Sequence, residues 1–473
     1  MSADAGHRGQ LTPSRFQNGA LVLASVLCNL GIFTLSWDRI GNLSAGSFNV
    51  KISIIAFLVS LALTVLGGHR LGQIVVPRLV LYLSLAMLLV LVVASVLADD
   101  QRTALLGVVT VVLGALVPAL AVVANSRIAG QFQEMLKWFV WGAVVACIFG
   151  LYQLLAFYTG LPQLIEYEGV SGGLGRISSF SYEPAYLGYF LVVVLVVALA
   201  RFRSTRWPWG YVQIGLVLVT LLLLNSRAVF LTLPLLLILV RPLASGLATF
   251  RQMWITAAAA VGAFLLVCVT VPSIPATLGA QFLSIFNPQE ASSNAPRLEL
   301  YTAALQVAAK YPIFGVGPSN FGIHIAELNY AQYEGVSLNK MVVNNIWLQS
   351  LMDGGAVLAI VQAALVVVAI VTIYFSKNVV ARILMAGWIA VILVGGMVVS
   401  NFYDAKMWVT LALAIAALQL GALRPETNAR RGTKDFTYVP IVPVIDITFP
   451  RTIRAKGVKI APGTAPARPE TEG

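Results

Sequence analysis

Charge is scarce in this sequence. Only 11% of its 473 residues are Asp, Glu, Lys or Arg, while 59% are hydrophobic and the mean hydropathy is +0.86. A soluble domain carries about a quarter of charged residues. The surplus of apolar residues has to face lipid, so the composition excludes a soluble globular protein and predicts a polytopic integral membrane protein.

Short alternating strands are missing as well. A membrane β-barrel would show alternation over segments of about ten residues, whereas the apolar runs here are continuous. Continuous runs are long enough to cross a hydrocarbon core of about 30 Å as helices. No small-residue cleavage site follows the first run, residues 16–35, so we expect a retained helix rather than a signal peptide. The predicted fold class is therefore all-α.

Cysteine and the common catalytic signatures are also rare. Cys28, Cys147 and Cys268 all lie inside apolar runs, which argues against a disulfide framework and a CxxC metal site. The sequence has no D-x-D pair for a metal–nucleotide-sugar site, no H-E-x-x-H and no convincing Ser/His/Asp set. We expect a site that uses neither a metal nor a cofactor.

Membrane-spanning runs are abundant. The tenth of the twelve that we place, residues 345–375, is long enough to begin as a helix outside the membrane or to tilt. We place twelve spans at roughly 16–36, 51–67, 78–98, 103–124, 137–158, 183–200, 208–224, 227–241, 252–272, 345–375, 379–399 and 407–423.

The basic residues predict the orientation of these spans. With a cytoplasmic N-terminus, the inside segments hold 22 of the 31 Lys and Arg residues and the outside segments hold nine. This distribution obeys the positive-inside rule and places both termini in the cytoplasm. The net charge of +12 is then mainly a topology signal rather than a sign of nucleic-acid binding.

The loops divide the chain into parts. Residues 1–423 form the predicted transmembrane domain, and its outside loop 273–344, between spans nine and ten, is far longer than a connection needs to be. This loop contains an amphipathic segment that begins at Pro296 and predicts a surface helix. Residues 424–473 are basic, rich in proline and without helical periodicity, so we expect a disordered cytoplasmic tail.

The first polar motif is GGLGRISSFSYEPAYLGYF, residues 172–190. Pro184 suits the first turn of a helix, and Glu183 just before it lies near the positive end of the helix dipole. Glu183 is either a helix cap or a carboxylate beside Arg176 that binds or deprotonates a sugar hydroxyl. We count Tyr182 among the substrate-binding residues.

The second motif is LLLLNSRAVFLTLPL, residues 221–235, in which Arg227 lies between two apolar runs. An arginine so close to hydrocarbon is costly unless it pairs or faces a wet cavity. It either extends to the outer interface or belongs to a substrate site. Its expected outside position runs against the positive-inside bias, which favours a substrate role.

The third motif joins Arg297 to KYPIFGVGPSNFG, residues 310–322. Arg297 either forms a surface ion pair or adds a guanidinium to the N–H groups at a helix start, which makes an anion site. The motif lacks the G-x-x-x-x-G-K-[ST] pattern of a nucleotide loop, but its glycines allow tight turns near a ligand. The substrate contacts predicted within it are Lys310, Gly315, Gly317 and Asn320.

The fourth motif is VVNNIWLQSLMDGG, residues 342–355, where a loop enters the tenth span. Asn344 and Asn345 either cap the helix or donate hydrogen bonds to a ligand rich in hydroxyls. Asp353, two turns further in, is protonated, paired with a basic residue or part of the site. Together the four motifs gather arginines, a carboxylate and amides on one side, which suits a pyrophosphate leaving group.

The order of these motifs resembles the O-antigen ligase and polymerase superfamily. The likeness covers about residues 170–400 and rests on Ser226-Arg227 between two spans, Arg297 at the start of a loop helix, and PIFGVGPSNF at 312–321. An N-x-x-L near the next span, which ends in Gly-Gly, completes it.

The resemblance implies an all-α membrane glycosyltransferase of the GT-C type. Such enzymes move a glycan from undecaprenyl pyrophosphate to an acceptor on the periplasmic face of the bacterial inner membrane. Ligases attach finished glycan to lipid A–core, and polymerases join the lipid-linked chain to the next repeat unit. The resemblance also implies an undecaprenyl-pyrophosphate-linked oligosaccharide as substrate, with a chain-length regulator and a flippase as partners.

One position separates the two branches of the family. Ligases typically carry His followed by Asn at the start of the tenth helix, whereas here Asn345 matches the Asn and Asn344 replaces the His. An amide takes up no proton near neutral pH. The S-Y-E-P element at 181–184 also resembles O-antigen and exopolysaccharide polymerases. We therefore predict a polymerase, with a ligase as the alternative and a transporter of lipid-linked glycan or small molecules as the alternative from another class.

The predicted mechanism divides the work among these residues. Arg297 together with Arg176 or Arg227 grips the donor pyrophosphate and stabilises its departing charge. Glu183 orients or deprotonates the acceptor hydroxyl, and the asparagines bind sugar hydroxyls. Arg297, Arg176 and Glu183 are thus the predicted catalytic residues.

Overall fold

The structure is a computed structural model of the 473-residue chain. The predicted ninth span, apart from four single positions, most of the long loop and the predicted cytoplasmic tail lie outside the residues that it describes. The described residues are 15–40, 43–45, 48–67, 76–165, 170–171, 174–204, 209–224, 226–240, 295–327, 342–400 and 402–422, with single positions 258, 262, 265 and 269.

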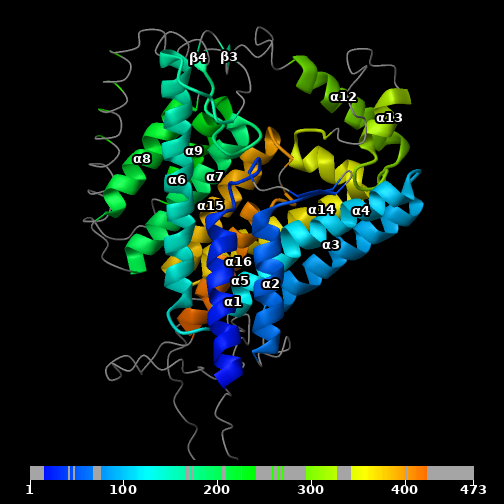
Figure 1. The fold of residues 1–473 in the computed structure, drawn as a ribbon. Helices are drawn as coiled ribbons and strands as arrows, with labels where there is room; N and C mark the ends of the chain where they lie inside the picture. The colour runs from blue at the N-terminus through cyan, green and yellow to red at the C-terminus, as the bar shows by residue number, and fades with distance from the viewer. Residues whose placement is uncertain are drawn as a thin grey trace, which may run out of the picture. The chain divides into compact units, whose positions relative to one another are not determined.

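The all-α prediction is confirmed. Each predicted span other than the ninth coincides with helical structure, and the fourth contains a short π-helical turn, η2 (Val112–Leu116), between α4 and α5 (Figure 1). The helices at these spans are α1 (Arg15–Phe33), α2 (Ile52–Leu66), α3 (Arg78–Leu97), α4 (Gln101–Val111), α5 (Val117–Asn125), α6 (Gln131–Thr159), α7 (Pro184–Ser204), α8 (Gly210–Leu223), α9 (Arg227–Val240), α14 (Ile346–Phe375), α15 (Val379–Leu393) and α16 (Ala405–Ala422).

Length and composition single out the strongest membrane spans. Among the described residues, six helical segments are long and apolar enough to cross a membrane, and four apolar helices are shorter. The count of twelve spans therefore stays a prediction. The six are Arg78–Leu97, Gln101–Asn125, Gln131–Thr159, Pro184–Arg201, Ile346–Phe375 and Val379–Met397.

Local sequence signals set several helix ends. Asp100 caps α4 by accepting a hydrogen bond from the Thr103 N–H at 3.0 Å, and Asn378 caps α15 by accepting from the Val380 N–H at 3.0 Å. Gly130 and Gly160 flank α6 with positive φ angles of 78° and 72°, which glycine adopts without steric cost. Polar caps and glycines thus divide a nearly continuous apolar sequence into separate helices.

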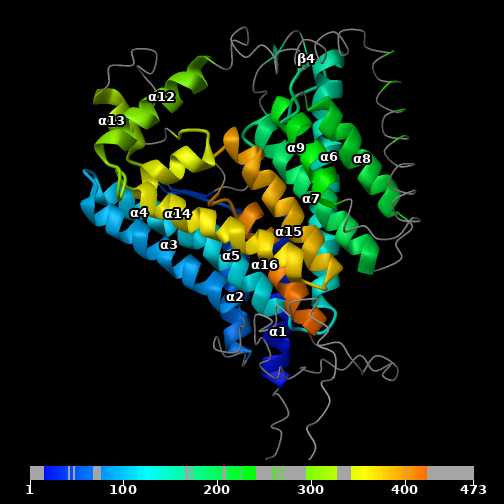
Figure 2. The ribbon, with the colours of Figure 1, turned by 180° about the vertical axis from the view of Figure 1, so that it is seen from behind.

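Two further helices lie at one end of the helix bundle. These are α12 (Ala295–Lys310) and α13 (Phe321–Glu327), near the end at which α7 begins (Figure 1). Two short antiparallel ladders also occur, β1 (Leu43–Ala45) with β2 (Phe48–Val50) and β3 (Val170–Ser171) with β4 (Leu174–Gly175). The opposite end of the bundle holds the start of α1 and the end of α16 (Figure 2). We call the first of these the α12–α13 end.

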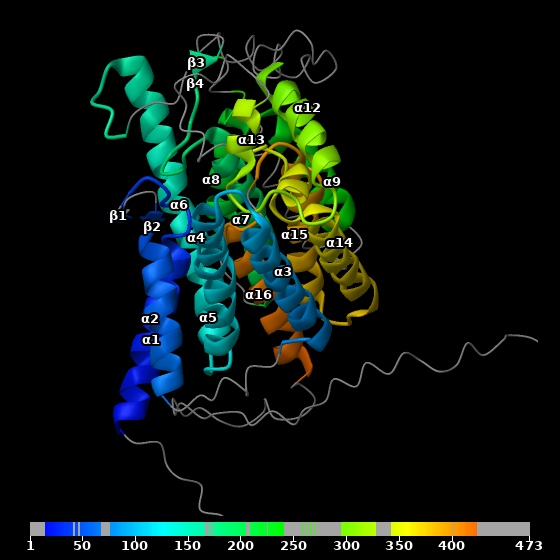
Figure 3. The same cartoon turned by 90° about the vertical axis from the view of Figure 1, so that its right-hand side faces the viewer.

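Burial distinguishes central helices from peripheral ones. In α7, 83% of the most apolar 18-residue window is buried, and in α15 the share is 72%. The corresponding share is only 28% in α14 and 33% in α3, which lie alongside each other at the edge of the bundle (Figure 3). Helix α7, which begins directly after Glu183, is therefore held by packing on nearly all sides.

A second, smaller hydrophobic core lies at the α12–α13 end. It joins one face of α12 to α13, to the loop between them and to the first turns of α14. The amphipathic helix expected in the long loop is thus present, and it begins at Ala295 beside the predicted Pro296. The buried members of this core are Leu300, Ala303, Ala304, Val307, Val316, Phe321, Ile325, Val343 and Met352.

Candidate functional site

Glu183 is positioned by a segment anchored on α6. Ser179 donates its side-chain hydroxyl to the Ala146 carbonyl at 2.7 Å, and its backbone N–H donates to Gln153 Oε1 at 2.7 Å. Ser179 has a φ of 53°, a left-handed conformation that these two bonds sustain. The segment then enters α7 at Pro184, directly after the half-buried Glu183. The loop before α7 is therefore a built feature rather than a loose connection.

The first turns of α7 lie near both Glu183 and Arg297. Tyr186 and Tyr189 follow Glu183 at intervals of three residues, so the three positions are spread over about 120° around the start of α7 and about 9 Å along it. The charge of Glu183 acts on Tyr186, and the charge of Arg297 acts on Tyr189. Two of the three predicted catalytic residues, Glu183 and Arg297, thus lie near the first turns of α7.

Arg297 lies in the first turns of α12 and is half-buried. One turn later, the Tyr301 hydroxyl lies 2.7 Å from the Met397 carbonyl and 3.1 Å from the Asn344 carbonyl. Burial raises the pKa of the Tyr301 phenol, against the opposing charge of Arg297. Tyr301 therefore fixes this end of α12 over the start of α14.

The two asparagines have different surroundings. Asn345 is buried, and its Oδ1 accepts hydrogen bonds from the N–H groups of Trp347 at 2.9 Å and Leu348 at 3.1 Å. It is the N-cap of α14, which is one of the two roles expected for it. Asn344 is half-buried with a φ of 53°, and its carbonyl lies 3.1 Å from the Tyr301 hydroxyl.

Arg227 and Arg176 flank the start of α7. Arg227 is the first residue of α9, and Val229 of that helix packs against Gly188 in the second turn of α7. Arg176 is half-buried and precedes Ile177, whose side chain packs against Gly150 of α6. The backbones of both predicted arginines therefore lie at the α12–α13 end.

The PIFGVGPSN motif has a structural role that its sequence did not reveal. Helix α14 is broken at Gly354 and Gly355, and Gly355 adopts a φ of 64° and a ψ of −161°. The loop after α12 fills this break: the Val316 N–H donates to the Met352 carbonyl at 2.8 Å, and the Ala356 N–H donates to the Pro312 carbonyl at 2.9 Å. Backbone groups that the break would leave unpaired inside a membrane are thereby satisfied.

This docking gives a packing role to Gly315, Gly317 and Asn320, whose contact with substrate stays a prediction. A Cβ at Gly315 would collide with the Met352 carbonyl, and one at Gly317 would lie 2.8 Å from Ala98 Cβ. Asn320 is fully buried, and its Oδ1 accepts from the Asp100 N–H at 3.1 Å. These residues hold the loop against α14 and the corner between α3 and α4.

Lys310, also a predicted substrate contact, lies far from Arg297. It is exposed at the C-terminal end of α12, thirteen residues after Arg297, which corresponds to about 20 Å along the helix axis. Near this end lies His324, whose Nε2 is 3.3 Å from the Asp99 carboxylate and whose ring is 5.1 Å from that of Tyr311. The predicted constellation therefore separates into two groups at opposite ends of α12.

Asp353 is buried in α14, immediately before the break. Gln349 donates from Nε2 to Asp353 Oδ1 at 2.7 Å, and Gln349 Oε1 accepts from the Val343 N–H at 3.0 Å. The Tyr403 side chain also lies next to this carboxyl group. The neighbours that hold the Asp353 carboxyl group, Gln349 and Tyr403, are therefore neutral groups.

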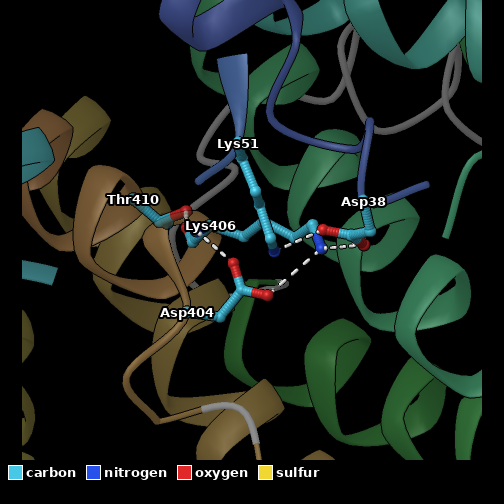
Figure 4. A network of polar contacts seen from close by, with 5 residues as sticks. All are labelled: Asp38, Lys51, Asp404, Lys406 and Thr410. Carbon is cyan, nitrogen blue, oxygen red and sulfur yellow. Dashed lines mark hydrogen bonds and ion pairs between the residues drawn. The ribbon is translucent and has the colours of Figure 1, made fainter. Parts of the chain in front are cut away.

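A network of four charged residues was not predicted from the sequence. Lys406 Nζ lies 2.8 Å from Asp38 Oδ2 and 3.2 Å from Asp404 Oδ2, and Lys51 Nζ lies 2.6 Å from Asp38 Oδ1 (Figure 4). We call Asp38, Lys51, Asp404 and Lys406 the charged tetrad. It joins the connection between α1 and α2 to the start of α16.

The tetrad is electrostatically self-consistent. The Lys51 ammonium is attracted by the carboxylates of both Asp38 and Asp404. Burial would raise the pKa of Asp404, but Lys406 and Lys51 hold it below its usual value. A usable signal was present in the sequence: Lys51 and Lys406 are two of the nine basic residues expected outside, against the positive-inside bias.

Comparison with known proteins supports the resemblance drawn from the motifs. Residues 212–363 match the sequence profile of a family described as O-antigen ligase. The matched segment includes Arg227, Arg297 and Asn345, whereas Glu183 and the charged tetrad lie outside it. No curated protein matches the chain. The resemblance to the O-antigen ligase and polymerase superfamily is thereby confirmed.

Proposed function

From the O-antigen ligase domain in residues 212–363 as premise, we propose that the protein is a polysaccharide polymerase. It joins repeat units linked to undecaprenyl pyrophosphate, as in O-antigen or exopolysaccharide synthesis. The proposal places it in the bacterial inner membrane, with both termini in the cytoplasm and the α12–α13 end in the periplasm. A chain-length regulator and a flippase are its proposed partners.

One observation carries the choice of a polymerase: the start of α14 offers no imidazole. Asn344 stands where ligases of the family carry His, and the Asn345 side chain caps the helix. Among the described residues the only histidine is His324, which lies near the far end of α12 and pairs with Asp99. A carboxylate can instead take the acceptor proton, and Glu183, directly before α7, is suited to this role.

The proposed transfer is a single displacement. A hydroxyl oxygen of the incoming repeat unit attacks the anomeric carbon of the growing chain, and the bond from that carbon to the pyrophosphate oxygen breaks. The hydroxyl proton passes to the Glu183 carboxylate. The electron pair leaves with undecaprenyl pyrophosphate, whose charge Arg297 stabilises with Arg227 or Arg176. No covalent enzyme intermediate is required.

The test is the size distribution of lipid-linked glycan in cells with and without the gene. Loss of a polymerase leaves single repeat units on undecaprenyl pyrophosphate. Loss of a ligase, the alternative supported by the description of the matched family, leaves long lipid-linked chains that never reach their acceptor. In the second case, the account given for Asn344 would be wrong.

A purified system tests whether the protein is an enzyme or a transporter. Detergent-solubilised protein is mixed with lipid-linked repeat units, and the chain lengths of the products are measured. An enzyme lengthens the chains without any membrane to cross, whereas a transporter leaves them unchanged.

A further inference from the structure

Lys51 is the accessible member of the charged tetrad. Its side chain is 24% exposed, whereas those of Asp38 and Lys406 are 2% and 3% exposed. Asp38 is held from its other oxygen by Lys406, so the carboxylate that orients Lys51 is itself immobilised. An ammonium has three N–H donors, and the contact with Asp38 occupies one of them.

The same region carries the S-Y-E-P element. Arg39, next to Asp38, donates from Nη2 to the Tyr182 carbonyl at 2.8 Å and from its backbone N–H to the Phe180 carbonyl at 2.9 Å. These bonds tie the connection between α1 and α2 to the segment that carries Glu183. Lys51 lies within the electrostatic reach of Tyr182, and both Lys51 and Glu183 act on Tyr186. The Tyr182 side chain, Lys51 and Glu183 thus form one patch, and Tyr182 is 40% exposed.

Two buried hydroxyls next to this patch lack partners. Within the described part of the chain, Ser36 Oγ and Ser181 Oγ are buried and make no hydrogen bond. Ser36 lies two residues before Asp38, and Ser181 directly precedes Tyr182. Buried hydroxyls without a partner are rare and call for a bound group or water to satisfy them.

The local charge decides which polar ligand fits. The charged tetrad is neutral as a cluster, because the ammonium groups of Lys51 and Lys406 balance the carboxylates of Asp38 and Asp404. The cluster has no surplus of positive charge to attract a pyrophosphate. An aromatic face beside an ammonium donor and a carboxylate acceptor suits a neutral sugar, whose ring has an apolar face and whose neighbouring hydroxyls both donate and accept.

We propose that Lys51, Tyr182 and Glu183 form the subsite for the acceptor sugar, and that Lys51 determines acceptor affinity. This inference rests on the proposed polymerase function and deepens it. Tyr182 covers the apolar face of the sugar, Lys51 donates to one hydroxyl, and Glu183 accepts from the attacking one. The tetrad keeps Lys51 in place, and Arg297, whose charge acts on Tyr189 of α7, serves the donor.

The test separates acceptor from donor. Purified protein in nanodiscs receives the lipid-linked repeat unit as donor and a soluble alkyl glycoside of the repeat unit as acceptor. The glycoside has no pyrophosphate and therefore acts only as acceptor. We expect Lys51→Met to raise the KM for the acceptor roughly tenfold or more, which is the loss of one hydrogen bond from a charged donor, and to leave the KM for the donor within about twofold.

Two further variants keep the result interpretable. Tyr182→Leu alters an exposed ring and leaves the tetrad intact, so it decides the matter if Lys51→Met folds poorly, and we expect the same selective rise. Lys137→Met is the matched control, because Lys137 pairs with Glu134 at 2.9 Å in the exposed first turns of α6 at the opposite end of the bundle, and both KM values should stay unchanged.

The outcomes distinguish this inference from the proposed function. If the wild type lengthens glycan but neither variant raises the acceptor KM, the subsite is wrong and the polymerase stands. If the donor KM rises instead, Lys51 serves the pyrophosphate and the subsite is again wrong. If the wild type forms no product with either substrate, the polymerase assignment itself fails.

Discussion

The two ends of α12 differ in how completely their polar groups are satisfied. At the Lys310 end, Gly315, Gly317 and Asn320 are in close contact with α14 and with the corner of α3 and α4, and the Asn320 amide is fully used. At the other end, the charge of Arg297 acts on Tyr189, whose buried hydroxyl makes no hydrogen bond in the described part of the chain.

This difference indicates that a recognisable motif can have a packing role. The glycine-rich motif after α12 is the most specific part of the sequence resemblance, yet its residues close a broken helix. The residues suited to chemistry are single charges spread over several segments, among them Glu183, Arg297 and Lys51. Packing demands a continuous local motif, whereas a substrate site needs only that scattered side chains converge.

The largest effect is expected at the Lys310 end of α12, where the loop packs against α14. We expect Gly355→Ala to destabilise the protein by about 4 kcal/mol or more, because its φ of 64° is strained for alanine and its Cβ would collide with the Ile313 carbonyl. The measurement is the thermal unfolding midpoint in detergent. Gly215→Ala in α8 is the matched control: its Cβ meets nothing within 4 Å, and stability should be unchanged or slightly raised.

The second-largest effect is expected at the Arg297 end of α12, on the rate of glycan transfer and not on stability. Arg297→Lys keeps the charge but loses the planar fork, so we expect transfer to fall roughly 100-fold at normal protein level and an unchanged unfolding midpoint. The rate of glycan elongation measures it. Lys310→Met, at the exposed end of the same helix, should leave that rate unchanged. Full elongation by Arg297→Lys would refute the arginine clamp.

A moderate effect on the free energy of unfolding is expected at Asn320. Asn320→Ala leaves the Asp100 N–H without its acceptor, so we expect a loss of about 1–3 kcal/mol in unfolding free energy. Elongation per folded molecule should stay at the wild-type rate. A variant that folds normally and loses elongation would return Asn320 to the substrate site.

The smallest effect concerns Asn345. Asn345→Ala removes a helix cap and should cost about 1 kcal/mol, whereas Asn345→Asp retains an acceptor for the Trp347 and Leu348 N–H groups and should keep stability. Unfolding midpoints and elongation rates are measured together. Normal stability of Asn345→Asp with lost elongation would show that the amide also binds sugar.

Much of the fold was predictable from local patterns. Long apolar runs predicted the helices, and the start of α12 beside Pro296 followed from its amphipathic pattern. The break in α14 was harder: Gly354-Gly355 lies inside one apolar run, and only contact with the loop after α12 makes a break tolerable there. The charged tetrad was missed because Asp38 and Lys406 are 368 residues apart in sequence.

The sequence by itself determined the membrane environment, the helices and the residue types available for chemistry, because composition, periodicity and capping act over a few neighbouring residues. Only the tertiary structure decided which of those residues meet. Glu183 and Arg297 both lie near the first turns of α7, and the Asp38 carboxylate that holds Lys51 is itself held by Lys406 from a distant segment. Such meetings depend on how helices pack against one another, a relation that no local stretch of sequence contains.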